Sequence, residues 1–372
     1  MKPEVAKRLR LLASTLSVLL VVALLGAGWA CWRIKASLPQ LEGSAAARGL
    51  TQAVTITRDT LGVPTIQAAN RADAARALGW LHGQERFFQM DILRRSAAGE
   101  LSEVFGKRAM VRERSARRHG FRKLAQAVVA RLEPGLRAIL DAYVEGVNSG
   151  RSALAERPFE YFVLREAPQP WRAEDSILVV YAMALDLQDE NAIYERTLMT
   201  IRDQFGLEGL AFFAPLVTPA DAALDGTTGP TAPIPGPKSV NLRPAKVGLL
   251  PPLPTGDPFP FFPRPLEAAV GSNAFALSGA HTASGAAMLA NDMHLDYSVP
   301  TTWYRASLQF AGQTVTGVTL PGAPAVVAGS NGRVAWGFTN SYVDVGDVVI
   351  VETSGIAPTL YRAPGYDELV AI

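Results

Sequence analysis

The chain has 372 residues, of which 48% are hydrophobic and 19% charged, and its formal net charge is +2. This composition excludes a disordered chain and suits a globular protein of two or more domains with a large core. The small net charge favours no nucleic-acid partner, and the basic segment 112–123 is interpreted as a solvated surface. The single cysteine, Cys31, excludes an intrachain disulfide and a metal site built from several cysteines.

A charge-free run at residues 11–32 follows Lys2, Lys7, Arg8 and Arg10. As a helix rising ~1.5 Å per residue, this run would be about 33 Å long, which is enough to cross a bilayer. The basic residues before it favour a cytoplasmic N-terminus. We therefore expect the rest of the chain to lie in the periplasm or on the outer face of the inner membrane.

Residues 1–35 have two interpretations, a signal anchor and a cleaved signal peptide. The apolar run is longer than in a typical cleaved signal, which favours the anchor. Two tryptophans and two basic residues at its end resemble an interfacial anchor: Trp29, Trp32, Arg33 and Lys35. Cys31 could also mark a lipoprotein site, but the residues before it fit the usual lipobox poorly.

Residues 36–214 are expected to form a mainly helical region after a polar linker at 36–52. Near its start, 54–59 alternates apolar and polar residues, and 65–68 resumes a strand after a turn, which predicts a hairpin.

A long helix is predicted from Asn70, which can cap it, with Asp73 in its first turn. The glycines Gly79, Gly83 and Gly99 are expected to break this helix into pieces. Further helices are predicted at 121–131, 136–147 and 176–205, the last with a polar interruption at 186–191.

Composition changes at residue 215, because 14 of the 26 prolines lie between 215 and 265. Proline has no N–H and a fixed φ, so this segment cannot form a helix or a central strand. We interpret 215–271 as a spacer, which is either an ordinary interdomain linker or a propeptide that covers a site until processing.

Short apolar runs separated by Gly, Pro, Asn and Asp fill residues 272–372 and predict a sheet-rich domain. These runs are 274–277, 287–290, 303–310, 314–318, 325–328, 334–338 and 348–351. The chain ends within this pattern of short apolar runs, so we expect this domain to be incomplete.

Gly271-Ser272-Asn273 stands between the proline-rich segment and the first of these runs. Alone, it is typical of a turn, but further motifs accompany it along the chain. These motifs are Gly62-Val63-Pro64-Thr65-Ile66, Leu78-Gly79-Trp80-Leu81-His82-Gly83-Gln84-Glu85-Arg86-Phe87, Ala290-Asn291-Asp292-Met293-His294, Gly329-Ser330-Asn331 and Ala335-Trp336-Gly337-Phe338-Thr339-Asn340.

With these motifs in order over roughly residues 50–352, the chain resembles the penicillin acylase family of N-terminal-nucleophile hydrolases. The resemblance implies an α+β fold, the αββα sandwich, with a helical small-chain region. It also implies a precursor that cuts itself between Gly271 and Ser272 into an alpha and a beta chain. The expected substrate is a small N-acyl amide, such as a penicillin-type β-lactam or an acyl-homoserine lactone.

The resemblance makes Ser272 the nucleophile and its freed α-amino group the base. This amine titrates near ~7.7–8.0, close to working pH, so no triad is needed. The family pattern assigns the oxyanion donors to the backbone N–H groups of His294 and Asn340, with the His294 side chain near the Ser272 amine. Removing one such donor typically costs ~100–1,000-fold in rate.

Glu195, Asp344 and Asp347 match the ligands of a structural calcium ion in relatives, and hard oxygen ligands suit Ca²⁺. The sequence departs from the family pattern at Thr65 and Ser330, where histidines are common. By the resemblance, a catalytic Asn and an assisting Arg would follow residue 372. The alternative is a membrane-anchored, inactive homologue that acts as a binding module.

Overall fold

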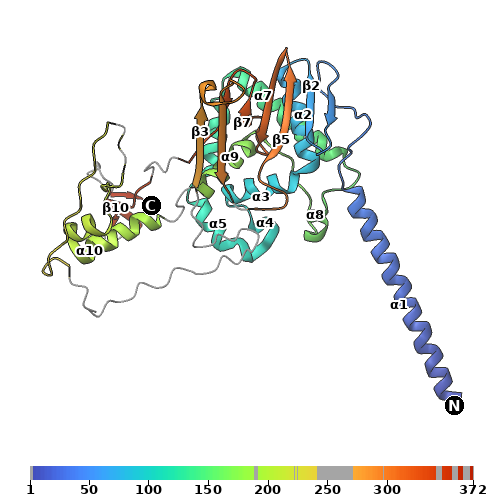
Figure 1. The fold of residues 1–372 in the computed structure, drawn as a ribbon. Coiled ribbons are helices and arrows are strands. Elements are labelled where there is room, and N and C mark those ends of the chain that lie inside the picture. Colours follow the sequence, from blue (N-terminus) through green and yellow to red (C-terminus); the bar gives the residue numbers. More distant parts are fainter. Residues whose placement is uncertain are drawn as a thin grey trace. The chain divides into compact units, whose positions relative to one another are not determined.

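The computed structural model describes residues 3–187, 192–240 except 222 and 224, 271–340 except 296, 346–353, 359–362 and 369–371. The chain divides into two compact units, one of residues 1–187 with 257–340 and the other of 188–256 with 341–372. Helices and strands both contribute to the first unit, which contains Ser272 (Figure 1).

The first unit begins with the apolar helix α1 (Pro3–Ala36), which confirms the predicted N-terminal helix. Its stretch Leu11–Ala36 is long and apolar enough to cross a membrane, and its most apolar window has no buried residues. Membrane insertion and cleavage of this helix stay predictions.

The main sheet combines strands from both ends of the unit. The hairpin of β1 (Thr55–Arg58) and β2 (Pro64–Ala68) forms as predicted, and β2 pairs in parallel with β5 (Tyr304–Phe310). In this register Ile66 lies opposite Leu308. The sheet order is β1-β2-β5-β6-β7-β8, with β6 (Gln313–Thr319), β7 (Val326–Ser330) and β8 (Ala335–Trp336) antiparallel to their neighbours.

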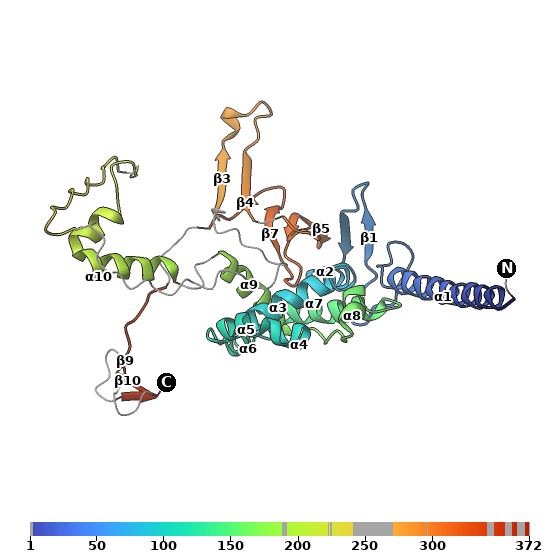
Figure 2. The same ribbon diagram turned by 90° about the horizontal axis from the view of Figure 1, so that it is seen from below.

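Helices lie on one side of this sheet (Figure 2), and α2 packs directly on β2 and β5 to enclose the core. They are α2 (Arg71–Glu85), α3 (Phe87–Ala98), α4 (Ser102–Phe105), α5 (Met110–Arg117), α6 (Phe121–Ala130), α7 (Pro134–Ala153), α8 (Phe159–Leu164) and α9 (Ala173–Leu187), with a short 3-10 turn at Gly106–Ala109. The Asn70 side chain accepts a hydrogen bond from the Asp73 N–H at 2.8 Å, so the predicted cap of α2 is confirmed. Burial of the apolar residues on these helices is the main force that holds them on the sheet.

The expectation that Gly79 and Gly83 would break the first helix is wrong. Both glycines lie inside α2, because this helix packs very closely against α7. A Cβ on Gly79 would lie 2.2 Å from the Tyr143 carbonyl oxygen, and one on Gly83 2.2 Å from that of Val147. Gly99 does end α3, in the left-handed conformation.

A buried polar network joins α2, α7 and the sheet at His82, whose side chain is fully buried. The Thr319 hydroxyl donates to the Tyr304 carbonyl, so it must accept from His82 Nε2, 3.1 Å away. His82 Nδ1 is then an acceptor for the Tyr143 hydroxyl at 2.8 Å. Burial and, to a smaller extent, the nearby Arg86 lower the pKa of His82 to about 3, so the ring is neutral at physiological pH.

An ionic cluster fixes α9 in the unit. The buried carboxylate of Asp91 accepts hydrogen bonds from Arg95 Nε at 3.0 Å and from the Tyr161 hydroxyl at 2.6 Å. Arg94 bridges Asp91 to Asp175 in the first turn of α9, at 2.6 and 3.1 Å. These ion pairs tie the first turn of α9 to α3.

The second unit contains α10 (Ile193–Phe213) and a small sheet of β9 (Glu352–Thr353), β10 (Leu360–Arg362) and β11 (Leu369–Ala371). Residues 346–351, where a strand was expected over 348–351, have no regular structure, and β9 begins just after them. Among the described residues of 214–240 there is neither a helix nor a strand, as their proline content predicts.

The described residues therefore confirm a mixed α and β fold with an N-terminal apolar helix. The stacked pair of sheets in the predicted αββα sandwich is not assembled by this part of the chain and stays a prediction.

Candidate active site

The candidate site is built on an antiparallel hairpin of β3 (Gly271–Leu277) and β4 (Met288–His294), joined through a 3-10 turn at Gly279–His281. In its register Gly271 lies opposite His294, and Ser272 lies opposite Met293. The predicted cleavage residue Gly271 and the predicted oxyanion donor His294 therefore face each other across the hairpin.

The hydroxyl group of Ser272 contacts Asn340, another residue of the predicted site. The backbone N–H of Asn340 donates a hydrogen bond to Ser272 Oγ at 2.8 Å, although the two residues are 68 positions apart. The Asn340 side chain in turn donates to the carbonyl oxygen of Leu187 at 2.8 Å. Leu187 is the last residue of α9, where helix carbonyls lack partners within the helix. Asn340 thus connects the nucleophile position to the end of α9.

The side chain of His294 lies on the other face of the hairpin. Side chains alternate along a strand, so His294 shares a face with Asp292 and not with Met293, which lies opposite Ser272. His294 Nε2 is 3.0 Å from Asp292 Oδ2 and 3.4 Å from Asn273 Nδ2. The expected contact of this side chain with the Ser272 amine stays a prediction, because that amine forms only on cleavage, whereas the His294 backbone lies opposite Gly271.

Asn291 holds the segment before Asn340 against the hairpin. Its side chain accepts from the Phe338 N–H at 3.2 Å and donates to the Phe338 carbonyl at 3.0 Å. The same amide donates to the Asn273 carbonyl at 3.1 Å. A Cβ on Gly337 would lie 2.6 Å from Asn291 Oδ1, so the approach requires a glycine there. These bonds fix Asn273, next to Ser272, and Phe338, two residues before Asn340.

The sequence assigns no role to Asn291, although this residue lies in the motif Ala290-Asn291-Asp292-Met293-His294. The signal that could have found it is the alternation of β4, which places Asn291 on the same face as Met293 and hence as Ser272. Its partner Phe338 is 47 residues away, and that contact required the structure.

The predicted calcium ligands cannot be brought together here, because Asp344 lies outside the described residues. Among the residues that are described, no three acidic, histidine or cysteine side chains form a cluster suited to a metal ion. One Asp347 oxygen accepts the Val348 N–H at 2.7 Å. The calcium site stays a prediction.

Comparisons with known proteins agree with these motifs. The sequence profile of the penicillin amidase family matches residues 53–370. The acyl-homoserine lactone acylase QuiP of Pseudomonas aeruginosa is 30% identical over 90% of this chain and 38% of its own length. The penicillin acylase 2 proenzyme of a Pseudomonas species is 31% identical over 85% of this chain and 40% of its own length. The chain thus spans about two fifths of the length of these curated relatives.

Among solved structures, a thermostable penicillin G acylase from Alcaligenes faecalis is 28% identical, covering 50% of this chain and 99% of that chain, with a TM-score of 0.40. This score is too low for the likeness to support a fold class.

Proposed function

Because the chain belongs to the penicillin amidase family, we propose that it is an amidohydrolase that cleaves N-acyl substrates through an acyl-enzyme on Ser272. The observation that carries the proposal is the hydrogen bond of the Asn340 N–H to Ser272 Oγ at 2.8 Å. The attack places negative charge on the carbonyl oxygen, two bonds from Oγ, so a preorganised backbone donor held beside Oγ lies close to where that charge develops.

The first step is self-cleavage. Ser272 Oγ attacks the carbonyl carbon of Gly271, the peptide C–N bond breaks, and the nitrogen of Ser272 takes up a proton to become an amine. Water then hydrolyses the resulting ester, which leaves a carboxylate on Gly271 and a free hydroxyl on Ser272. Gly271 favours this step because it lacks a Cβ that would restrict the backbone.

The second step is acyl transfer from the substrate. The α-amino group of Ser272 takes the hydroxyl proton, Oγ bonds to the acyl carbon, and the protonated base returns a proton to the departing amine. The carbonyl oxygen of the substrate lies two bonds from Oγ in the intermediate, so it comes within reach of the Asn340 N–H. The backbone N–H of His294 is the second proposed donor, because His294 lies opposite Gly271.

In this scheme Asn291 is a positioning residue. Its side chain hydrogen-bonds to the Phe338 backbone on both sides and so holds the Asn340 N–H at Ser272 Oγ. Asn340 has a second constraint in its bond to Leu187, whose helix is fixed by the ionic cluster around Asp91 and Asp175.

The proposed substrates are penicillin-type β-lactams and acyl-homoserine lactones, in both of which an acyl group is joined to an amine by a linear amide. The names of the relatives support both classes equally. A panel of N-acyl amides with short, long and aromatic acyl groups, tested on the processed full-length protein, would separate the two classes.

Four further features belong to the proposal. The αββα sandwich is the proposed fold, and the alpha and beta chains remain together as a heterodimer after processing, which the pairing of β2 with β5 supports. Glu195, Asp344 and Asp347 are the proposed ligands of a structural Ca²⁺ ion. Helix α1 is the proposed membrane anchor, with the rest of the chain exported.

The proposal is tested on the full-length protein by intact mass and N-terminal sequencing. We expect a new N-terminus at Ser272 and an uncut chain in Ser272→Ala. The matched control Ser284→Ala, at an exposed serine between β3 and β4, should be cut normally. A folded wild-type protein that stays whole at neutral pH would overturn self-cleavage and favour an inactive, membrane-anchored binding module.

A further inference from the structure

The second half of α1 is docked against α8. Arg33 Nη2 forms an ion pair with Glu156 Oε2 at 2.9 Å, and the Glu156 N–H donates to the Ala36 carbonyl at 3.1 Å. The rings of Trp29 and Phe162 meet edge to face at 5.3 Å between centroids. The Arg33 guanidinium lies 5.6 Å and 5.3 Å from the centroids of these two rings. These contacts fix the position of α8 along the axis of α1, at the level of Trp29.

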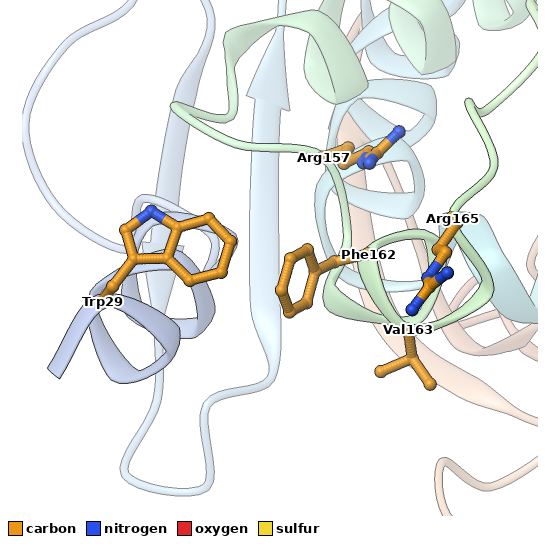
Figure 3. Close-up of a pocket in the computed structure, with 5 residues that line it drawn as sticks. All are labelled: Trp29, Arg157, Phe162, Val163 and Arg165. Atoms are coloured by element: carbon orange, nitrogen blue, oxygen red, sulfur yellow. The ribbon is translucent and has the colours of Figure 1, made fainter. Parts of the chain in front are cut away.

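A cavity of about 470 Å³ lies where these two helices meet, lined by Trp29, Arg157, Phe162, Val163 and Arg165. Figure 3 shows the ring of Phe162 facing Trp29, with Arg157 and Arg165 on the other side of Phe162. The lining therefore combines an apolar side and a cationic side, and no predicted step of catalysis uses it.

With α1 across a bilayer, its length would place this cavity at the edge of the hydrocarbon core. A hydrocarbon core of about 30 Å corresponds to about 20 helical residues at ~1.5 Å each. Counted from Leu11, the first residue of the charge-free run, the core ends near Ala30. Trp29 thus lies where tryptophan is favoured, between acyl chains and headgroups. Since α8 contacts Trp29, α8 lies at the same depth.

The exposed side chains of the α8 region suit that depth. Val163 is 70% exposed and Phe159 is 47% exposed, so both leave apolar surface in water. Arg157 is half-buried and donates from Nη1 to the Glu166 carbonyl, and Arg165 is exposed. Of the nearby carboxylates, Glu156 is paired with Arg33, Glu166 is exposed, and burial raises the pKa of Glu160.

We propose that residues 156–166 form a second membrane contact, beside the helical anchor. Phe159 and Val163 enter the interface of the bilayer that α1 crosses, and Arg157 and Arg165 bind the phosphates of its phospholipids. Guanidinium groups suit this role because they offer several donors to phosphate oxygens. The inference rests on the proposed anchoring by α1. Two contacts would hold the exported unit in a fixed orientation on the membrane, whereas a single helix leaves it free to tilt.

The contact is tested on the full-length chain in vesicles of phosphatidylethanolamine and phosphatidylglycerol. In a Cys31→Ala background, single cysteines at Val163, Val111 and Leu20 carry an environment-sensitive fluorophore. Val111 is the matched control, a valine 72% exposed on α5, and Leu20 reports insertion of α1. We expect the label at 163 to shift to shorter wavelength and to be quenched severalfold by a shallow lipid quencher, while the label at 111 stays in water.

The outcomes separate the contact from the anchor. A label at 163 that behaves like the one at 111, while the label at 20 is buried, overturns the second contact and leaves the anchor intact. Water around the label at 20 overturns both. Charge removal tests the phosphate contact: Arg157→Gln with Arg165→Gln should reduce quenching at 163, whereas Arg131→Gln, at an exposed arginine outside α8, should not. Equal quenching in both variants would refute phosphate binding.

Discussion

Replacing Asn291 with alanine tests how the Asn340 N–H is held at Ser272. The change removes three hydrogen bonds, two of them to the Phe338 backbone. At ~0.5–1.5 kcal/mol of net stabilisation each, the two bonds to Phe338 hold the segment by about 1–3 kcal/mol. Since ~1.4 kcal/mol is a factor of ten, we expect Asn291→Ala to slow self-cleavage by about 5- to 150-fold.

The upper end of this range falls just inside the ~100–1,000-fold that complete loss of one oxyanion donor costs, and that loss is the ceiling for a purely positional effect. The assay follows the new N-terminus at Ser272 by intact mass over time, with acyl release by the processed protein as a second readout. Both rates should fall together, because both steps use the same donor.

Asn148 provides a matched control. Its side chain brackets the backbone of Trp171 in the same two-way manner, donating to its carbonyl at 2.9 Å and accepting its N–H at 2.8 Å. Asn148→Ala should therefore lower stability by a similar amount without slowing cleavage. If Asn291→Ala is cut as fast as wild type, or is slowed no more than Asn148→Ala, the positioning role of Asn291 is refuted.

Three other predictions concern stability. Gly79→Ala should lower the free energy of unfolding by at least about 1–3 kcal/mol in denaturant titration, because its Cβ would meet the Tyr143 carbonyl. The control Gly135→Ala has open space around it and should cost nothing. Equal effects of the two changes would contradict the close packing of α2 on α7. At His82 the unfolded state binds more protons than the folded state between pH 6.5 and about 3, so the free energy of unfolding should fall by about 2 kcal/mol from pH 6.5 to 5. His82→Gln should remove this dependence on pH. An unchanged dependence in the variant would argue against a neutral buried ring. Ca²⁺ at 100 times its Kd should raise Tm by about 3–4 °C, and Glu195→Gln should abolish this increase. An identical increase in the variant would exclude Glu195 as a ligand.

Local signals predicted much of the fold. The hairpin of β1 and β2, the Asn70 cap and most of the later strands follow from alternation, turn residues and capping chemistry, which act over a few residues. The glycine prediction failed because helix propensity is a local property, whereas Gly79 and Gly83 serve a contact with α7 more than 60 residues away.

Long-range geometry limited the prediction of the site. Family resemblance pointed to Ser272, His294 and Asn340, and the structure brings Asn340 onto the Ser272 hydroxyl. The family resemblance could not assign a role to Asn291, because its partner Phe338 depends on how the segment after β8 folds back over the hairpin. The direction of the His294 side chain depends on strand register, which one residue of shift would reverse.

The parallel pairing of β2 with β5 has a consequence for a chain that is cut at Gly271. Before the cut, the covalent chain keeps the two strands together, and refolding is a first-order process. After the cut, the same sheet is shared by separate polypeptides, and its recovery from denaturant becomes a second-order reaction limited by concentration. Cleavage would thus make folding a one-way event: the mature protein keeps its structure by unfolding slowly, and dilution after denaturation would not restore it.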